Sequence, residues 1–382
     1  MEHEVEGGPY VWQTPAWPHG WRWDPAALVD GEAEVRRLQG RVRAKAALLT
    51  GEDAAALRLE AVSEEALRTS GIEGEVLQRD SVRASVRRHL EGDLGLLPRH
   101  RAVDGLVEVL LDATANAEEP LTTERLCAWH AALFPTGRSG MRAITVGAWR
   151  EGAEPMQVVA QSLDQTRVRF QAPPSERVAA EVATLVAWVE GDAVPDGLIR
   201  AALAHLWFET IHPFDDGNGR IGRALADLLL ARDEGATRRL WSLSAEIDAR
   251  RAEYYARLGQ AQRGDGEITA WLAWFLGCVA AALLAAEARC DRVLARVRYW
   301  QHHGVVALNE RQAKLLDRLL RAGPGGFDGG MSTRKAAALT GASRATAQRD
   351  LADLVSRGLI VPLEAGGRST AYEPAWPSDV EP

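Results

Sequence analysis

The chain has 382 residues, of which 46% are hydrophobic and 26% charged, a composition that excludes disordered, collagen-like and fibrous proteins. Its length predicts two to three domains at about 150 residues each, and its net charge of −8 excludes a chain that binds nucleic acid over its whole surface. Three cysteines without a Cys-x-x-Cys pair argue against a disulfide scaffold and a cysteine-based zinc site, and they predict a cytoplasmic protein.

The N-terminal segment combines an acidic start with a cluster of tryptophans. Residues 1–6 are acidic and lack an apolar stretch, so we expect no signal peptide. We expect the tryptophans that follow to seat an irregular arm by packing, because an indole buries a large area. The alternative is a platform that stacks on a ligand. The four tryptophans are Trp12, Trp17, Trp21 and Trp23.

The middle of the chain is predicted to be helical with one short β interruption. Helical periodicity runs from residue 25 to about 133 and again from 175 to about 298. Residues 137–174 carry short β-branched runs bounded by Gly and Pro, which predict a small hairpin. The longest apolar run, 271–286, is 16 residues long. It is shorter than the ~20 residues that span a bilayer, so we expect a buried helix and no membrane contact.

The composition changes again near residue 300. Three helical patterns and two β-prone segments predict a winged helix-turn-helix. Between Met331 and Tyr372 there are six basic and three acidic residues, so the local charge is 6 − 3 = +3. The helix that begins at Ser343 carries Arg344 and Arg349 near its start, residue types that bind phosphate or read a DNA groove. DNA is therefore a candidate partner, and protein contact or dimerisation is the alternative.

The stretch from Ile211 to Arg223, IHPFDDGNGRIGR, concentrates polar chemistry at the start of a helix. An apolar stripe after it predicts that the helix begins near Gly219 and leaves free N–H groups and a positive dipole end as an anion site. Gly217 and Gly219 allow close approach of a ligand to the backbone. Arg220 and Arg223 lie three residues apart on one face, which suits a polyphosphate.

Two further residues in this stretch suit phosphate chemistry. Asp216 is a hard oxygen ligand of the kind that Mg²⁺ prefers on phosphate. His212 lies just before the turn and is of the residue type that accepts a proton near neutral pH. Taken singly, a core histidine and an ordinary Asp-Gly-Asn-Gly turn are the plain alternatives. A phosphate loop of the Walker type is excluded, because the sequence has no Gly-Lys pair.

The whole stretch resembles the complete signature of the Fic family, His-x-Phe-x-(Asp/Glu)-Gly-Asn-Gly-Arg-x-x-Arg, and the resemblance covers roughly residues 50 to 290. It implies an all-helical core that transfers AMP from ATP and Mg²⁺ to a Ser, Thr or Tyr hydroxyl of a protein substrate. The resemblance is also compatible with self-modification of the chain and with a homodimer. By position, it implies that His212 is the base, Phe214 the loop anchor, Asp216 the Mg²⁺ ligand, Gly217, Asn218 and Gly219 the cradle of the α- and β-phosphates, Arg220 the β-phosphate ligand and Arg223 the γ-phosphate ligand.

The same resemblance assigns two flanking features. A β-hairpin flap that aligns the target segment is implied at Met156, Gln157, Val158 and Val159, opposite residues 168–170, by strand addition; a plain structural hairpin is the alternative. The residues near the adenine are implied at Tyr254 and Tyr255, for which packing in the core is the alternative.

An inhibitory motif is implied upstream, at Thr69-Ser70-Gly71-Ile72-Glu73-Gly74. It resembles (Ser/Thr)-x-x-x-Glu-(Gly/Asn), the motif of the N-terminally autoinhibited class of the family. The implied role is that Glu73 pairs with Arg223 and displaces the γ-phosphate. The same residues also read as a capping box at the start of a helix, with Ser70 as the cap and Glu73 as its partner.

The expected fold is therefore mostly α: an all-helical Fic core with a small β-hairpin flap, plus a C-terminal winged helix-turn-helix. The expected parts are a Trp-rich arm and first helix at 1–50, a helical region with the inhibitory motif at 51–110, the catalytic core at 111–295 and the winged helix at 300–382. Removal of AMP, transfer of another phosphate-containing group, and a DNA-binding regulator whose core senses nucleotide remain alternatives. His212 argues against the last, because a pure sensor needs no base.

Overall fold

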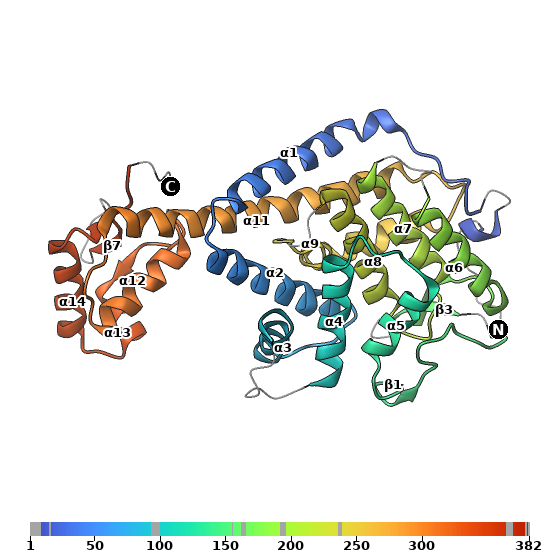
Figure 1. Cartoon of the computed structure of the whole chain (residues 1–382), viewed down its shortest axis with the longest axis horizontal. Helices are drawn as coiled ribbons and strands as arrows, with labels where there is room; N and C mark the ends of the chain where they lie inside the picture. The colour runs from blue at the N-terminus through green and yellow to red at the C-terminus, as the bar shows by residue number, and fades with distance from the viewer. Residues whose placement is uncertain are drawn as a thin grey trace. The chain divides into compact units, whose positions relative to one another are not determined.

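The computed structural model describes residues 9–14, 17–92, 100–154, 156–161, 166–191, 196–235, 239–363, 370–378 and 380. The predicted mostly helical fold is confirmed within these residues (Figure 1). The helices are α1 (Val29–Ala46), α2 (Gly51–Ile72), α3 (Arg79–Glu91), α4 (Arg101–Ala115), α5 (Thr123–Leu133), α6 (Ser175–Val189), α7 (Gly197–Ile211), α8 (Asn218–Glu234), α9 (Leu243–Ala249), α10 (Arg251–Ala261), α11 (Thr269–His303), α12 (Glu310–Ala322), α13 (Thr333–Thr340) and α14 (Arg344–Ser356).

The described strands form three small antiparallel sheets. The pairs are β1 (Arg138–Ser139) with β2 (Arg142–Ala143), and β3 (Gln157–Gln161) with β4 (Thr166–Gln171). Val158 is opposite Phe170 and Val159 is opposite Val168, so the hairpin expected in this region is present. The sequence predicted one hairpin within 137–174 and did not predict β1 and β2 as a separate pair, because each of these strands has only two residues. The third sheet has the order β5 (Met331–Ser332), β7 (Ala371–Pro374), β6 (Ile360–Pro362).

Contacts divide the chain into two units, Met1–Gly40 with Ala55–Ala285 and Arg41–Ala54 with Ala286–Pro382. In the first unit α7 and α8 pack together at the core, and almost every residue of both helices is buried. A helix that is apolar all round is stable only when other elements surround it, which explains the central place of α7. Asp196 caps this helix and accepts hydrogen bonds from the N–H groups of Leu198 and Ile199.

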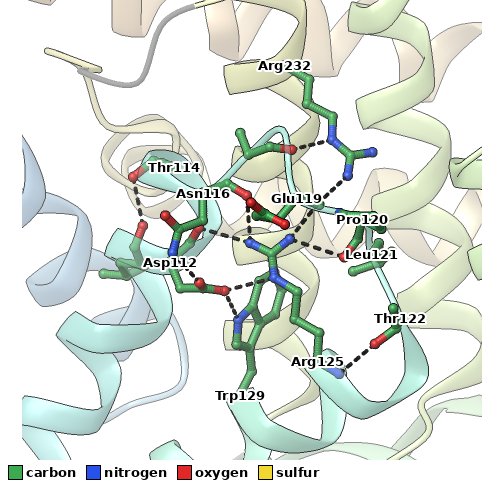
Figure 2. Close-up of polar contacts among 12 residues, drawn as sticks. Asp112, Thr114, Asn116, Glu119, Pro120, Leu121, Thr122, Arg125, Trp129 and Arg232 are labelled. Carbon is green, nitrogen blue, oxygen red and sulfur yellow. Dashed lines mark hydrogen bonds and ion pairs between the residues drawn. The ribbon is translucent and has the colours of Figure 1, made fainter.

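The connection between α4 and α5 is held by Arg125, which donates hydrogen bonds from all three of its side-chain nitrogens (Figure 2). Arg125 donates from Nε to Asp112 Oδ2 at 2.9 Å and from Nη2 to the carbonyls of Asp112 and Asn116. The indole of Trp129 donates to the same Asp112 oxygen at 2.7 Å. Arg232 of α8 donates to the carbonyl of Glu119 at 2.8 Å. These bonds hold α5 against α4 and α8, and α5 carries residues of the candidate site.

The tryptophan-rich arm packs on the first unit as predicted. Trp12 donates from its indole to the carbonyl of Gln171 in β4 at 2.8 Å, and Trp17 donates to Glu181 of α6 at 2.7 Å. Trp17 also meets Trp207 of α7 edge to face, with ring centroids 6.0 Å apart. The arm therefore bridges the β3–β4 hairpin and the helical core.

Helix α11 contains the long apolar run. By length and composition it is the one helix among the described residues that would suffice to cross a membrane, and 56% of the relevant window is buried inside the protein. Trp271, Leu272 and Phe275 are at most 1% exposed, so this part of α11 is the buried helix that the sequence predicted.

The second unit has its own core. Residues of α12, α13, α14 and the three-stranded sheet surround Leu316, Leu319, Leu351 and Leu354, all at most 1% exposed. Three helices and two strands were expected here, and β5 adds a third strand. The predicted wing tip around Gly366 and Gly367, with Glu364 and Arg368, lies outside the described residues.

Candidate active site

The signature stretch forms the turn between α7 and α8. His212 ends α7 in the left-handed region, with φ 50° and ψ 61°, and it is the one non-glycine residue with positive φ in the described part of the chain. Such a conformation costs a residue with a Cβ about 1 kcal/mol or more. Strain of this kind persists only where neighbouring groups hold the backbone, and here Arg150 donates from Nε to the His212 carbonyl at 2.8 Å.

The base of the turn is aromatic. Phe214 is fully buried and stacks on His130 of α5 with ring centroids 4.1 Å apart. His130 Nδ1 accepts the N–H of Gly147 at 3.0 Å, so its Nε2 carries the proton and donates to the Asp216 carbonyl at 3.2 Å. Burial lowers the pKa of His130 to about 4, so the ring is neutral at pH 7.

The loop is closed by Asn218. Its side chain accepts the N–H of Phe214 at 2.9 Å and donates to the Phe214 carbonyl at 2.8 Å. Its side chain therefore serves the loop itself, and only its backbone N–H is directed by α8 toward an anion. Gly217 has φ 79°, and a Cβ there would lie 2.8 Å from the Phe134 ring. No other residue type fits this position without strain.

Asp216 is half-buried at the same turn. Its Oδ1 accepts the N–H of Gly217 at 2.6 Å, and its Oδ2 accepts the hydroxyl of Ser139 from β1. No cluster of three or more His, Cys, Asp or Glu with metal-binding geometry occurs among the residues the structure describes. A single carboxylate still fits Mg²⁺, because that ion usually keeps several waters and takes the rest of its ligands from substrate phosphates.

Arg223 is 1% exposed and meets the candidate inhibitory motif. It donates from Nη2 to Glu73 Oε1 at 2.7 Å and to the Thr69 carbonyl at 3.0 Å, and from Nε to the Thr69 hydroxyl at 2.8 Å. A Cβ on Gly219 would overlap the same Glu73 oxygen. The carboxylate of Glu73 thus lies against the first turn of α8, where the helix N-terminus favours an anion.

The end of α2 explains the order of residues in this motif. Gly74 is left-handed with φ +85°, its N–H bonds to the Gly71 carbonyl, and the N–H of Glu75 bonds to the Ser70 carbonyl at 2.9 Å. This pattern is a Schellman cap, which ends a helix and needs a residue that tolerates positive φ. The capping-box interpretation of Ser70 and Glu73 is therefore wrong, because these residues lie at the C-terminus of a helix, where Ser70 supplies a carbonyl.

The same cap places a second carboxylate that the sequence analysis missed. Glu75 Oε2 accepts a hydrogen bond from Arg220 Nη1 at 3.0 Å. The side chain of Arg220 is 7% exposed and lies 5.0 Å from the centre of the Phe134 ring, whereas Glu75 is nearly half exposed. Both arginines of the signature are therefore held by acids that follow one helix.

His212 is half-buried, and two titratable groups beside it, Glu209 and Arg150, are buried. Desolvation, and second the charge of Arg150, lower the pKa of His212 to about 4. The imidazole is therefore neutral at pH 7, the form that accepts a proton. Desolvation raises the pKa of Glu209, one turn earlier on α7, to about 8. Glu209 is thus protonated at pH 7, and its carboxyl lies beside Gly222, where a Cβ would be 2.6 Å from Oε1.

The two tyrosines and the hairpin lie at the edges of this site. Tyr254 is 1% exposed and its hydroxyl bonds to His205 Nε2 at 3.0 Å, so it is a core residue. Tyr255 is half-buried, with its hydroxyl 3.4 Å from the carbonyl of Ile72. In the hairpin, Gln157 is exposed, while Met156 and Val158 pack toward a cluster that includes Tyr10 and Trp12; the side chain of Val159 is outside the described residues.

The sequence analysis missed four residues of this site: His130, Ser139, Arg150 and Glu75. A signal for His130 was available, because it continues the buried stripe of Leu126, Trp129 and Leu133 in α5. A histidine on such a stripe is a buried polar group that needs partners. The others are recognisable only from contacts across 60 to 150 residues of chain.

Comparison with known proteins agrees with this site. Residues 120–230 match the sequence model of the Fic/DOC family, and residues 10–91 match a family described as a domain of unknown function, DUF4172. The segment 120–230 therefore belongs to the Fic/DOC family, and that part of the predicted resemblance is confirmed.

Two curated relatives are named protein adenylyltransferases. One, a probable enzyme of Aquifex aeolicus, is 37% identical over 65 residues, which is 17% of this chain and 20% of the relative. The other, fic-1 of Caenorhabditis briggsae, is 35% identical over 99 residues, which is 25% of this chain and 18% of the relative. The chain thus matches about a fifth of the length of these relatives.

A solved Fic family protein from Desulfovibrio desulfuricans G20 superposes with a TM-score of 0.56 at 21% identity, covering 93% of this chain and 97% of that one. At this identity the likeness establishes a shared fold.

Proposed function

We propose that this chain is a protein adenylyltransferase that transfers AMP from ATP to a hydroxyl group of a protein and is inhibited by Glu73. The single observation that carries the proposal is the hydrogen bond between Glu73 and Arg223 beside the N-terminus of α8. It joins an anion site to a carboxylate that competes for it. The three described cysteines are free thiols, which fits the cytoplasmic location that we propose.

In this reaction His212 takes the proton of the target hydroxyl. The hydroxyl oxygen forms a bond to the α-phosphorus of ATP, the bond from that phosphorus to the α–β bridging oxygen breaks, and pyrophosphate leaves. The first N–H groups of α8 and the two signature arginines, Arg220 and Arg223, would hold the phosphates. Asp216 would hold Mg²⁺, which neutralises phosphate charge when bound. Positioning and charge neutralisation supply most of the rate in such transfers.

The candidate flap supports the choice of a protein substrate. Gln157 is exposed in β3, and an exposed strand edge can pair with an extended peptide. Strand addition would use backbone hydrogen bonds and so would accept targets of varied sequence. We place the target segment along Met156, Gln157, Val158 and Val159, and self-modification is part of the proposal.

The experiment uses ATP labelled at the α-phosphate, cell lysate and purified full-length protein. Transfer of label to protein by the Glu73→Gly variant, and none by Glu73→Gly with His212→Ala, is the expected result. The rival reactions separate clearly: γ-labelled ATP marks protein only in phosphoryl transfer, and an AMP-modified protein loses label only if the site removes AMP. No label on any protein from either nucleotide would refute the proposal.

A second candidate function rests on α14. Ser343 caps this helix by accepting the N–H of Thr346 at 3.2 Å, and Arg344 and Arg349 behind it are exposed. Asp350 is buried in an ion pair with Arg311 at 2.7 Å, so the start of α14 presents positive charge without a free acid. We propose that this unit is a winged helix-turn-helix that binds DNA phosphates through α14.

Binding is tested by fluorescence anisotropy with genomic DNA fragments at low and moderate salt. The double variant Arg344→Ala, Arg349→Ala is expected to weaken binding and reduce its salt dependence. The matched control removes two exposed basic residues of α12, Lys314→Ala with Arg321→Ala, and is expected to bind like the parent. Binding that is absent at low salt, or equally reduced by both pairs, would leave protein contact as the role of this unit.

A further inference from the structure

One buried arginine outside the signature contacts two parts of the candidate site, the turn after α7 and the base of the β3–β4 hairpin. Arg150 lies between β2 and β3 and is 5% exposed. Its Nη2 donates to the carbonyl of Pro173 at 2.5 Å and to that of Ile211 at 3.3 Å, and its Nε donates to the carbonyl of His212 at 2.8 Å. Its own N–H donates to the Pro213 carbonyl at 2.9 Å. Within the part of the chain the structure describes, no carboxylate forms an ion pair with it.

The partners of Arg150 are informative. Ile211 and His212 are the last carbonyls of α7, where a helix leaves acceptors without intrahelical donors and where the dipole favours a cation. A guanidinium carries five donors in a rigid fork, so one side chain satisfies several carbonyls with fixed geometry. This explains how His212 keeps its left-handed backbone without being a glycine.

The third carbonyl that Arg150 binds, that of Pro173, belongs to the β3–β4 hairpin side of the site. Pro173 is the second residue after β4, and next to it the N–H of Ala172 bonds to the carbonyl of Met156 at 2.9 Å, which closes the base of the β3–β4 hairpin. A single guanidinium therefore ties the end of the hairpin to the residue proposed as the base. Because Arg150 is buried beneath both, it has no access to nucleotide or target.

We propose that Arg150 is a positioning residue, which holds His212 and the start of the β3–β4 hairpin in one fixed arrangement. This arrangement places the target hydroxyl between the imidazole of His212 and the α-phosphorus of the nucleotide. This inference rests on the proposed adenylyl transfer. It predicts a loss in the chemical step with no loss in nucleotide binding, since the phosphate-binding residues are on α8 and the four hydrogen bonds of Arg150 described above reach none of them.

The test follows self-modification of the full chain with α-labelled ATP over a range of ATP concentrations, in the Glu73→Gly background. Arg150→Ala is expected to lower the maximal rate about 10²-fold, the cost of misplacing a reacting group by about 1 Å, at an unchanged half-saturating ATP concentration. Arg150→Lys keeps the cation and is expected to recover part of the rate. Methylguanidinium at millimolar concentration is expected to do the same for Arg150→Ala.

Arg88→Ala is the matched control, because Arg88 has a side chain 8% exposed and pairs with Asp104 on the α3–α4 face. It is expected to keep the maximal rate, which separates positioning from a general loss of stability. An Arg150→Ala protein with the parent rate, or with a raised half-saturating ATP concentration and an unchanged maximal rate, would overturn the proposal. If Arg150→Ala does not fold, the same comparison is made with Arg150→Lys, which must then fall below the parent rate.

A second readout needs no activity. Amide hydrogen exchange is expected to rise in residues 166–172 and 211–217 together in the Arg150 variants, and in neither segment in Arg88→Ala. A rise in only one segment, or in none, would overturn the proposal. If the Glu73→Gly parent transfers no label while exchange behaves as expected, the proposed function fails and the tie made by Arg150 stands.

Discussion

Glu73→Gly should convert the protein from an inhibited to an active form, and the contacts allow the size of the effect to be worked out. Arg223 is buried and holds Glu73 through a charge-assisted hydrogen bond of 2.7 Å, a class worth about 1.5–3 kcal/mol. At about 1.4 kcal/mol per tenfold change, this bond weakens binding of the γ-phosphate to Arg223 by about 10-fold to 10²-fold. Because the Glu73 side chain is 31% exposed, solvent screening favours the lower end.

The assay measures self-labelling from α-labelled ATP at a subsaturating concentration, with thermal unfolding in parallel. The variant should label about tenfold faster than the wild type. Without ATP it should melt at a lower temperature, because Arg223 loses a buried partner, and ATP should raise its melting temperature more than that of the wild type. Glu60→Gly, at an exposed position of α2, is the control for loosening of this helix, which Glu73 follows directly.

One result would refute this reasoning: a folded Glu73→Gly protein that labels no faster than the wild type and gains no extra stabilisation from ATP. The bond between Glu73 and Arg223 would then serve only to fasten the C-terminus of α2 to α8. A rise in labelling by Glu60→Gly equal to that by Glu73→Gly would point to loosening of the helix in place of release of the arginine.

Four further predictions follow from the same contacts. His212→Ala should bind ATP normally, seen by calorimetry, and lose about 10²–10⁴ in transfer rate, the usual contribution of a general base. Asp216→Ala should lose activity together with its dependence on Mg²⁺ concentration, and full Mg²⁺-dependent activity would contradict the ligand role. Glu75→Ala should raise labelling by at most about fivefold, because its pair with Arg220 is half exposed and such pairs are worth ~1 kcal/mol or less. Burial raises the pKa of Glu209 from 4.5 to about 8, so the native state keeps a proton that the unfolded state releases; urea unfolding should show wild-type stability falling by up to about 1.4 kcal/mol per pH unit across this window relative to Glu209→Gln.

Those parts of the protein that depend on neighbouring residues are predictable from the amino-acid sequence. Apolar periodicity placed α7, α8 and the buried α11, and β-branched runs bounded by Gly and Pro placed the β3–β4 hairpin. The turn from His212 to Arg223 was recognisable because its glycines, acids and arginines occupy neighbouring positions, so their spacing alone describes a helix start that suits phosphate. Two-residue strands such as β1 carry too little periodicity to be recognised.

The long-range partners of these residues, by contrast, become apparent from the folded chain. The pattern Ser-Gly-Ile-Glu at 70–73 fits the start of a helix as well as its end, and the packing of α2 and the left-handed Gly74 place it at the end. Arg220 meets Glu75 across 145 residues, and Arg150 meets the His212 carbonyl across 62. The physical reason is that periodicity reports which face of an element is buried, whereas the partner of a buried charge depends on how faces distant in the chain pack together.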